Sequence, residues 1–238
     1  MSDLAGKRAL VTGGTGGIGR AIVERFVTSG AEVTYTGASP NSGALEIGEF
    51  RYVDLLDRSD VSDFIGVTCN ERFDILVNCA GINRISPFSV ISDDDFDQVL
   101  EINLRAPMAL SRALVPQMVE RGWGRIINVG SIFGVISRES RATYSASKFG
   151  LDGLSSGLAA EVARHGVLVN TIAPGFVDTE LTRSVLGPDG IRDVEMTIPV
   201  GRLAHPSKIA ELAMWLASER NTYVSGQTVV IDGGYVRI

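Results

Sequence analysis

Sulfur and histidine are scarce in this 238-residue chain. The two cysteines, Cys69 and Cys79, show neither metal-ligand spacing nor a disulfide framework. We interpret both as small buried residues of a protein in a reducing compartment. The two histidines, His165 at a helix end and His205 before a proline, are expected on the surface without a catalytic role. No metal site is predicted.

Basic residues are also in the minority. Lys and Arg total 22 against 28 Asp and Glu, which gives a net charge of -6, and they form no dense run. Nucleic acids and anionic membrane surfaces both require a concentrated basic patch, so neither is expected as a partner. No apolar stretch is long enough to cross a bilayer, and the N-terminus enters a strand-like run too early for a signal peptide. The sequence predicts a cytoplasmic protein.

The chain does contain a regular alternation of strand-length apolar runs and amphipathic helical stretches. The apolar runs are continuous, as is typical of parallel strands covered on both faces. This order predicts an α/β fold for residues 1–238, a single-domain Rossmann-type doubly wound, mainly parallel seven-stranded sheet with helices on both faces. The predicted strands are Arg8–Thr12, Glu32–Thr36, Phe50–Val53, Ile75–Asn78, Arg125–Val129, Leu168–Ala173 and Thr228–Ile231. The predicted helices are Gly19–Ser29, Ser92–Glu120, Tyr144–His165 and Ser207–Ser218.

Three segments depart from this alternation. Gly37–Glu49 is rich in Gly, Ser, Pro and Asn, which predicts a loop or one helical turn in place of a crossover helix. Asp178–Arg202 is interrupted by glycine and proline, which predicts a mobile substrate lid of loop and helix. Four aspartates between positions 93 and 97 follow Ser92, a good N-cap. They are interpreted as the first turn of a helix and not as a cation site.

The first predicted strand ends in a glycine-rich turn, Gly13-Gly14-Thr15-Gly16-Gly17-Ile18-Gly19, and a helical pattern follows at once. Glycines permit positive φ, let the backbone approach a pyrophosphate and allow the helix to pack closely on the strand. The N–H groups at the helix start then face the phosphates. A glycine turn between a first strand and a first helix indicates a dinucleotide site.

The end of the second strand, Tyr35–Ser39, bears on which nicotinamide dinucleotide binds. A carboxylate there would bind the ribose 2′-hydroxyl of NAD and repel the 2′-phosphate of NADP. None is present, and no arginine stands there to pair a phosphate. The hydroxyls of Thr36 and Ser39 favour NADP(H) over NAD(H) by a small margin. The choice between the two stays open.

Tyr144 and Lys148 stand four residues apart in a helical stretch, so their side chains share one face. A free phenol has a pKa of about 10, and action as a base near neutrality requires a drop of about 3 units, roughly 4 kcal/mol. One cation about 4 Å away at an effective dielectric constant near 20 supplies about that much. Lys148 and a cationic oxidised nicotinamide are therefore sufficient. Alone, such a pair is more often a surface coincidence.

Other polar residues gather at the same predicted edge of the sheet. Ser131 follows the strand Arg125–Val129, and Asn78 ends the strand before it. The carboxyl edge is where doubly wound sheets bind ligands. Asn103 lies in the middle of a predicted helix, where Asn is a poor helix former and needs a reason to be present.

Together these motifs resemble the short-chain dehydrogenase/reductase family over the whole chain. The matching pieces are Thr12-Gly13-x-x-x-Gly17-x-Gly19, Asn78-x-Ala80-Gly81, Asn103, Ser131, Tyr144-x-x-x-Lys148, Pro174-Gly175 and Thr179. Three positions depart from the family pattern. Cys79 replaces a common Asn, Gly16 replaces the Arg of many NADP-preferring members, and Gly37 replaces the Asp of NAD-preferring members.

The resemblance implies a catalytic tetrad of Asn103, Ser131, Tyr144 and Lys148. Tyr144 would be the general acid or base, and Lys148 would lower its pKa and bind the nicotinamide ribose. Ser131 would hydrogen-bond the substrate oxygen, and Asn103 would hold a water that links Lys148 to solvent. The implied cofactor-binding residues are Gly13, Thr15, Gly17, Ile18, Gly19, Ser39, Asp54, Leu55, Asn78, Ala80, Gly81, Tyr144, Lys148, Pro174, Gly175, Val177 and Thr179.

Some of these cofactor residues have specific implied contacts. Asp54 would meet the adenine amine, and Asn78 with Gly81 would line the adenosine ribose. Thr179 would hold the nicotinamide carboxamide.

The resemblance also implies an NAD(P)-dependent oxidoreductase that moves a hydride to a ketone or from a secondary alcohol, in a small-molecule or carrier-bound substrate. The closing segment Val224–Gly234 is most similar to bacterial 3-oxoacyl-[acyl-carrier-protein] reductases, and Arg121, Arg125 and Arg164 are candidates for contact with an acidic carrier. Alternatives are a sugar, polyol or secondary-metabolite dehydrogenase of the same family, epimerase or dehydratase chemistry, and a non-catalytic dinucleotide-sensing scaffold.

Two arginines lie where the family places a wall of the substrate pocket. Arg138 and Arg141 stand between the tetrad serine and tyrosine and are candidates to clamp a carboxylate or a phosphate. Arg84, just after the cofactor motif, is a weaker candidate.

Three glycines, Gly150, Gly153 and Gly157, interrupt the helix that begins at Tyr144. Each costs about 1 kcal/mol relative to alanine. Close packing of a helix from a second subunit is the expected compensation, which predicts a homotetramer or a homodimer.

Overall fold

The computed structural model describes residues 3–40 and 43–237 around one sheet. Seven strands lie in the order β3-β2-β1-β4-β5-β6-β7, and the pairings of the described strands are all parallel. The strands are β1 (Arg8–Thr12), β2 (Glu32–Gly37), β3 (Glu49–Tyr52), β4 (Ile75–Asn78), β5 (Gly124–Val129), β6 (Val167–Pro174) and β7 (Thr228–Ile231). The predicted doubly wound, seven-stranded sheet is confirmed, and it is fully rather than mainly parallel.

The strand order places a switch point at the centre of the sheet. The chain runs outward from β1 to β3, returns to β4 beside β1, and then runs outward to β7. Thr12 of β1 is in register with Asn78 of β4, and Asn78 with Asn128 of β5. The carboxyl ends of the three central strands therefore meet at one edge, the position at which open α/β sheets bind ligands.

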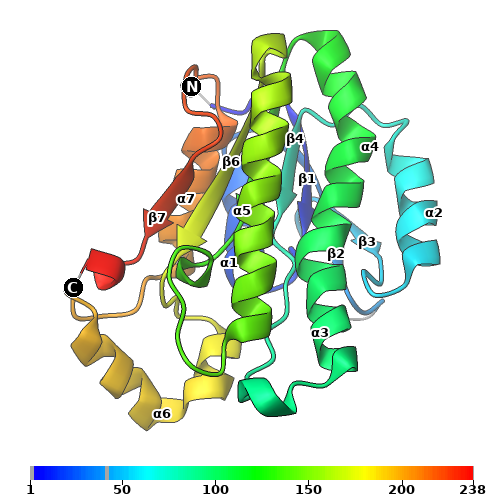
Figure 1. The fold of residues 1–238 in the computed structure, drawn as a ribbon. Helices are drawn as coiled ribbons and strands as arrows, with labels where there is room; N and C mark the ends of the chain where they lie inside the picture. The colour runs from blue at the N-terminus through cyan, green and yellow to red at the C-terminus, as the bar shows by residue number, and fades with distance from the viewer. Residues whose placement is uncertain (1–2, 41–42, 238) are drawn as a thin grey trace.

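Helices cover both faces of the sheet and give it two hydrophobic cores (Figure 1). The helices are α1 (Gly17–Thr28), α2 (Arg58–Thr68), α3 (Asp93–Leu100), α4 (Ala106–Arg121), α5 (Ala142–Val162), α6 (Glu180–Thr197) and α7 (Pro206–Ala217). One core joins α1 and α7 to the sheet, and the other joins α2, α4 and α5 to the opposite face. Helix α2 is an addition to the sequence prediction.

The predicted helix Ser92–Glu120 is interrupted in the structure. Helix α3 ends at Leu100, five residues from Glu101 to Arg105 form a π-helix, and α4 follows from Ala106. A π-helix accommodates one residue more per turn than an α-helix, and such bulges occur often at functional sites. Asn103 lies at the middle of this π-segment, so the prediction of one continuous helix is wrong at that position.

The segment predicted as a lid, 178–202, contains α6, which lies beyond the carboxyl ends of the strands (Figure 1). The helix is kinked at Gly187, which has φ 64° and ψ 176°. Between β2 and β3 the described residues of 38–48 form a loop and contain no helical turn, whereas Gly37 and Glu49 belong to the two strands. The mobility of the 178–202 segment stays a prediction.

Several smaller predictions have clear outcomes. The Ser92 side chain caps α3 by accepting a hydrogen bond from Asp95 N, which confirms the interpretation of the acidic run. Both histidines are exposed, as predicted. Both cysteines are only partly buried, so the expectation of two buried residues is wrong: Cys69 is the C-cap residue of α2, and Cys79 directly follows β4.

Within residues 3–40 and 43–237 no helix combines the length and the apolar character that a membrane span needs. The same residues contain no group of three or more His, Cys, Asp or Glu side chains arranged to hold a metal ion.

Candidate active site

The glycine turn is packed so closely that a Cβ would clash at Gly13, Gly14 and Gly19. Gly13 has φ +68°, and a Cβ there would lie 2.8 Å from Ala80 Cα. A Cβ on Gly19 would lie 2.0 Å from Gly13 O. The Thr12 hydroxyl accepts hydrogen bonds from Cys79 N and Ala80 N, both at 3.1 Å. The turn after β1 and the turn after β4 therefore form one rigid unit.

The start of α1 suits a pyrophosphate. Gly16 is its N-cap residue, no side chain caps the helix, and its first turn contains no acidic residue. A Cβ on Gly16 would meet no atom of the described residues within 4 Å. Free helix N–H groups and the positive end of the helix dipole bind phosphate oxygens. The residues present therefore fit the dinucleotide that the sequence predicts.

The hydroxyls predicted to favour NADP have different surroundings. Thr36 is 1% exposed, and its hydroxyl accepts a hydrogen bond from Gly13 N at 3.4 Å. Thr36 therefore supports the glycine turn, and the prediction that it contacts a 2′-phosphate is wrong. Ser39 is exposed beyond the end of β2. A Cβ on Gly37 would lie 2.7 Å from Thr15 Cγ2.

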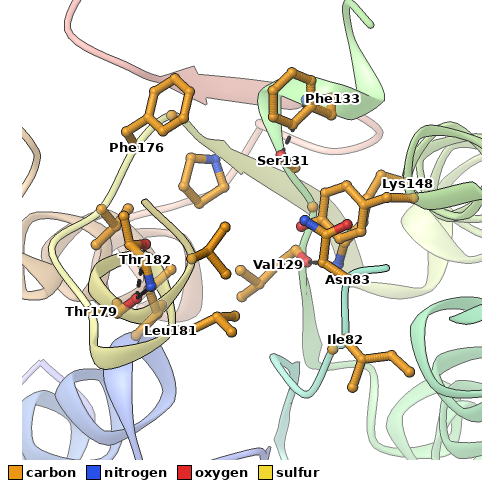
Figure 2. A pocket seen from close by; sticks show the side chains of 18 of the residues that line it. Ile82, Asn83, Val129, Ser131, Phe133, Lys148, Phe176, Thr179, Leu181 and Thr182 are labelled. Carbon is orange, nitrogen blue, oxygen red and sulfur yellow. Dashed lines mark hydrogen bonds between the residues drawn. The ribbon is translucent and has the colours of Figure 1, made fainter. Parts of the chain in front are cut away.

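Three tetrad side chains line one cavity at the carboxyl edge. Ser131 follows β5, whereas Tyr144 and Lys148 come from the first two turns of α5. Figure 2 shows Ser131 and Lys148 on one side of the cavity, facing Thr179 and Leu181 on the other. The cavity also takes in six residues predicted for the cofactor: Ile18, Gly81, Pro174, Gly175, Val177 and Thr179.

The surroundings of Tyr144 act on its pKa in both directions. Burial raises the pKa of its phenol, and a hydrogen bond with Ser131 and the charge of Arg141 oppose that rise. Lys148 Nζ lies 5.6 Å from the centroid of the Tyr144 ring and donates a hydrogen bond to Val129 O at 2.9 Å. That Lys148 lowers the pKa of Tyr144 stays a prediction.

The buried Lys148 side chain is expected to make the unfolding free energy depend on pH. Burial lowers its pKa from 10.5 to about 8. Between these two values the unfolded chain binds more protons than the folded one, so stability rises with pH in that window. The unfolding free energy of the wild type relative to Lys148→Met is expected to rise by about 2 to 3 kcal/mol between pH 7 and pH 10.

Urea unfolding of both proteins across this pH range measures that difference. The subtraction removes the other groups that titrate in the same range. A difference that stays constant with pH would show that Lys148 has an ordinary pKa.

Asn103 is fully buried and organises the segment that follows β4. Its Oδ1 accepts a hydrogen bond from Ile82 N, and its Nδ2 donates to Ile82 O, both at 2.9 Å. The same Nδ2 donates to Ser147 Oγ at 3.0 Å. Asn103 therefore joins the turn after β4 to α5, which explains an asparagine within a helical stretch. Its predicted water contact stays a prediction.

Nine of the predicted cofactor residues lie outside the cavity lining, and three of them, Asn78, Asp54 and Leu55, are engaged or buried elsewhere. Asn78 is 2% exposed, and its Nδ2 donates to Asn128 Oδ1 at 2.7 Å between neighbouring strands. Its side chain therefore links β4 to β5, and its predicted contact with the adenosine ribose stays a prediction. Asp54 Oδ1 accepts a hydrogen bond from Leu56 N at 2.9 Å in the turn after β3, and Leu55 is buried.

The structure also brings residues into the cavity that the sequence did not single out. Asn83 and Phe133 come from the turns after β4 and β5, Phe176 follows β6, and Leu181 and Val185 belong to α6. Phe133 and Phe176 stack edge to face at 6.4 Å between centroids. Position just after a buried strand was the available signal for the first three.

The three candidate arginines, Arg84, Arg138 and Arg141, differ in whether they line the cavity. Arg141 lines the cavity, whereas Arg138 is exposed and lies outside it. Arg84 forms an ion pair with Asp95 at 3.1 Å on the surface. Only Arg141 of the three, among the described residues, contributes to the cavity wall.

A family model for short chain dehydrogenases matches residues 7–188. The chain belongs to the short-chain dehydrogenase family. A curated member, the 3-oxoacyl-[acyl-carrier-protein] reductase FabG of Salmonella typhimurium, is 39% identical over 238 residues, which cover 96% of this chain and 97% of that protein.

Solved structures of other short-chain dehydrogenases superpose closely on this chain. One from Beutenbergia cavernae, provisionally assigned as an NAD(P)-dependent gluconate 5-dehydrogenase with bound NADP, has a TM-score of 0.94 at 35% identity and covers 99% of both chains. A gluconate 5-dehydrogenase from Burkholderia cenocepacia in complex with NADP and tartrate has a TM-score of 0.92 at 30% identity, covering 99% of this chain and 97% of that one. This short-chain dehydrogenase is therefore an NAD(P)-dependent oxidoreductase of ketones and secondary alcohols.

The glycines of α5 in this short-chain dehydrogenase are not equivalent. A Cβ on Gly150 would lie 3.0 Å from Leu104 Cδ2, so Gly150 is explained by packing within the chain. A Cβ on Gly153 or Gly157 would meet nothing within 4 Å. The prediction of an intersubunit contact therefore fails for Gly150 and stays open for the other two.

Proposed function

We propose that this short-chain dehydrogenase catalyses the NADPH-dependent reduction of a ketone to a secondary alcohol and the reverse oxidation. The observation that carries the proposal is the convergence of Ser131, Tyr144 and Lys148 in one cavity beside the glycine turn. The proposal is tested by measuring ketone turnover through the loss of absorbance of the reduced nicotinamide. An intact tetrad weighs against a dinucleotide-sensing scaffold.

The proposed proton path uses side chains of the cavity. Ser131 donates a hydrogen bond to the carbonyl oxygen, and Tyr144 transfers its phenolic proton to that oxygen as C=O becomes CH–OH. Bound NADPH supplies the hydride that reduces the carbonyl carbon. Lys148 Nζ lies 5.6 Å from the Tyr144 ring centroid. When the Lys148 ammonium is charged, it stabilises the Tyr144 phenolate that remains after proton transfer. Phe133 and Phe176 restrict water at the reacting carbon.

A substitution at Gly37 tests the proposed preference for NADPH over NADH. Gly37→Asp is expected to weaken NADPH binding at least about tenfold and NADH binding much less, because a carboxylate repels the 2′-phosphate. The Cβ contact with Thr15 Cγ2, at 2.7 Å, is with a side chain that can rotate away. Fluorescence titration with both nucleotides gives the two dissociation constants.

Gly66→Asp is the matched control, since it adds the same charge at a position where a Cβ meets nothing within 4 Å. An equal loss of NADH and NADPH binding in Gly37→Asp would indicate steric damage and would contradict the proposed charge effect.

Two substrate classes follow from the relatives. The similarity to FabG supports a 3-oxoacyl group on a carrier protein, whereas the similarity to gluconate 5-dehydrogenases supports a sugar acid. Two of the three arginines proposed to meet a carrier are engaged: Arg125 is 5% exposed, and Arg121 pairs with Asp74 at 3.5 Å. Arg141 in the cavity is the specific observation that favours the acid.

The finer expectations about assembly and location stay proposals. The exposed face of α5 at Gly153, Gly157 and Phe149 supports a homodimer or homotetramer, which analytical ultracentrifugation tests. A cytoplasmic location stays a prediction.

A further inference from the structure

The guanidinium of Arg141 lines the cavity and is not paired with a carboxylate of the described residues. Arg141 is the N-cap residue of α5, three positions before Tyr144, and it lines the cavity. Among the described residues, Lys148 and Arg141 are the charged side chains of that wall, and no Asp or Glu contributes to it. Within residues 3–40 and 43–237, Arg141 forms no ion pair. The cavity wall therefore carries positive charge without compensation.

Arg125, which is 5% exposed, gives a comparison for Arg141, which is partly buried. Arg125 donates hydrogen bonds to the carbonyls of Gly124, Gly166 and Asn221 at 2.8, 3.2 and 2.9 Å. Arg141 instead lies with its guanidinium 5.4 Å from the centroid of the Phe133 ring. The aromatic face orients the cation but accepts none of its N–H groups in the way that a carboxylate does.

The electrostatic surroundings of Arg141 are unfavourable without a ligand. Burial and the neighbouring charge of Arg138 both lower the pKa of its guanidinium. A partly buried cation with a like charge beside it is stabilised when an anion enters the cavity. Lys148 already donates to Val129 O at 2.9 Å, so Arg141 is the group left to bind that anion.

A second polar group in the same wall is incompletely bonded. Asn83 lines the cavity, and its Oδ1 is buried without a hydrogen-bond partner in the described chain. An amide oxygen accepts from a hydroxyl group and does not bind a carboxylate. Asn83 and Arg141 are therefore suited to bind different parts of one ligand, a hydroxyl group by Asn83 and an anionic group by Arg141. Figure 2 shows Asn83 beside Lys148.

We infer that the substrate is a small oxo acid, or the corresponding hydroxy acid, whose carboxylate pairs with Arg141 while Ser131 and Tyr144 hold its ketone. A further hydroxyl of the same molecule donates to Asn83 Oδ1. The inference rests on the proposed ketoreductase function and narrows its substrate to a carboxylate, as opposed to an acyl thioester. Bidentate pairing with a guanidinium fixes the orientation of a carboxylate as well as its position.

Matched substrates test the inference. Linear oxo acids with the ketone two to five carbons from the carboxylate are compared with their methyl esters, with an acetoacetyl thioester and with a ketone phosphate ester. The wild type is expected to prefer the acid over its ester. In Arg141→Met the acid-over-ester ratio of kcat/KM is expected to fall about 10- to 100-fold, mainly through KM.

The control variant is Arg138→Met, because Arg138 has the same side chain, stands three residues away and is exposed outside the cavity. It is expected to change the ratio by less than about threefold, as exposed charges do. Equal losses for acid and ester in Arg141→Met would overturn the inference, as would a preference for the thioester that this variant leaves unchanged. A stronger preference for the phosphate ester would overturn the carboxylate assignment.

Binding separates this inference from the proposed function. Calorimetric titration of the NADPH-saturated protein with tartrate and succinate is expected to show binding that Arg141→Met loses and Arg138→Met keeps. Absence of carboxylate binding to the wild type would overturn the inference even if ketones are reduced. Carboxylate binding without turnover of any ketone would instead contradict the proposed function alone.

Discussion

Replacing Tyr144 with Phe is expected to lower kcat by about 10³-fold, within the range that positioned general acids contribute. The variant removes the phenolic proton and keeps the ring, which packs edge to face on Phe133 at 6.4 Å and lies beneath Lys148. NADPH binding is therefore expected to stay within about twofold of the wild type, since it draws on the glycine turn for most of its contacts. Steady-state turnover and nucleotide titration on the same preparation measure both effects.

A second tyrosine provides the control for this loss. Tyr223 is 95% exposed and lies outside the cavity, so Tyr223→Phe should keep full turnover. If Tyr144→Phe retained more than about a tenth of wild-type kcat, another group would be supplying the proton, and the mechanism proposed for the cavity would be wrong.

Replacing Gly19 with Ala is expected to weaken NADPH binding by about 100-fold or more and to lower the unfolding free energy by about 1 to 3 kcal/mol, the usual cost of overpacking. The added Cβ would lie 2.0 Å from Gly13 O. That oxygen is backbone, so relief requires the turn itself to move, and the N–H groups that hold a pyrophosphate move with it. Fluorescence titration and urea unfolding report the two effects.

Gly16→Ala is the matched control within the same turn. Its Cβ would meet nothing within 4 Å, and Gly16 has φ -153°, an extended conformation that alanine adopts freely. This variant should bind NADPH and unfold like the wild type. Wild-type binding by Gly19→Ala would show that the close contact between Gly19 and Gly13 does not set the geometry of the phosphate site.

The sheet was predictable because its residues follow a local rule. The strands Arg8–Thr12, Ile75–Asn78 and Thr228–Ile231 have the predicted bounds, since continuous apolar runs flanked by turn residues mark the strands of a parallel sheet. The helix Arg58–Thr68 was missed because only Val61, Phe64 and Thr68 of its residues are buried. A helix with so narrow an apolar face gives a weak periodic signal.

The site was predictable in its residue types and less so in their surroundings. The tyrosine–lysine pair and Ser131 converge as predicted because parallel strands end at one edge. Whether Thr36 or Ser39 is accessible, and whether Arg138 or Arg141 enters the cavity, depends on packing between distant segments. No local pattern distinguishes the members of those pairs, which differ only in what the rest of the chain places against them.

The π-segment at Glu101–Arg105 has a consequence for how the site is encoded. Each residue of an α-helix advances the direction of its side chain by about 100°, so a single inserted residue turns everything after it through that angle. The bulge sets the rotational phase between α3, which precedes it, and α4, which follows it. Asn103, within the bulge, reaches both Ile82 and Ser147. The alignment of the tetrad thus depends on the number of residues between two helices as well as on their identity.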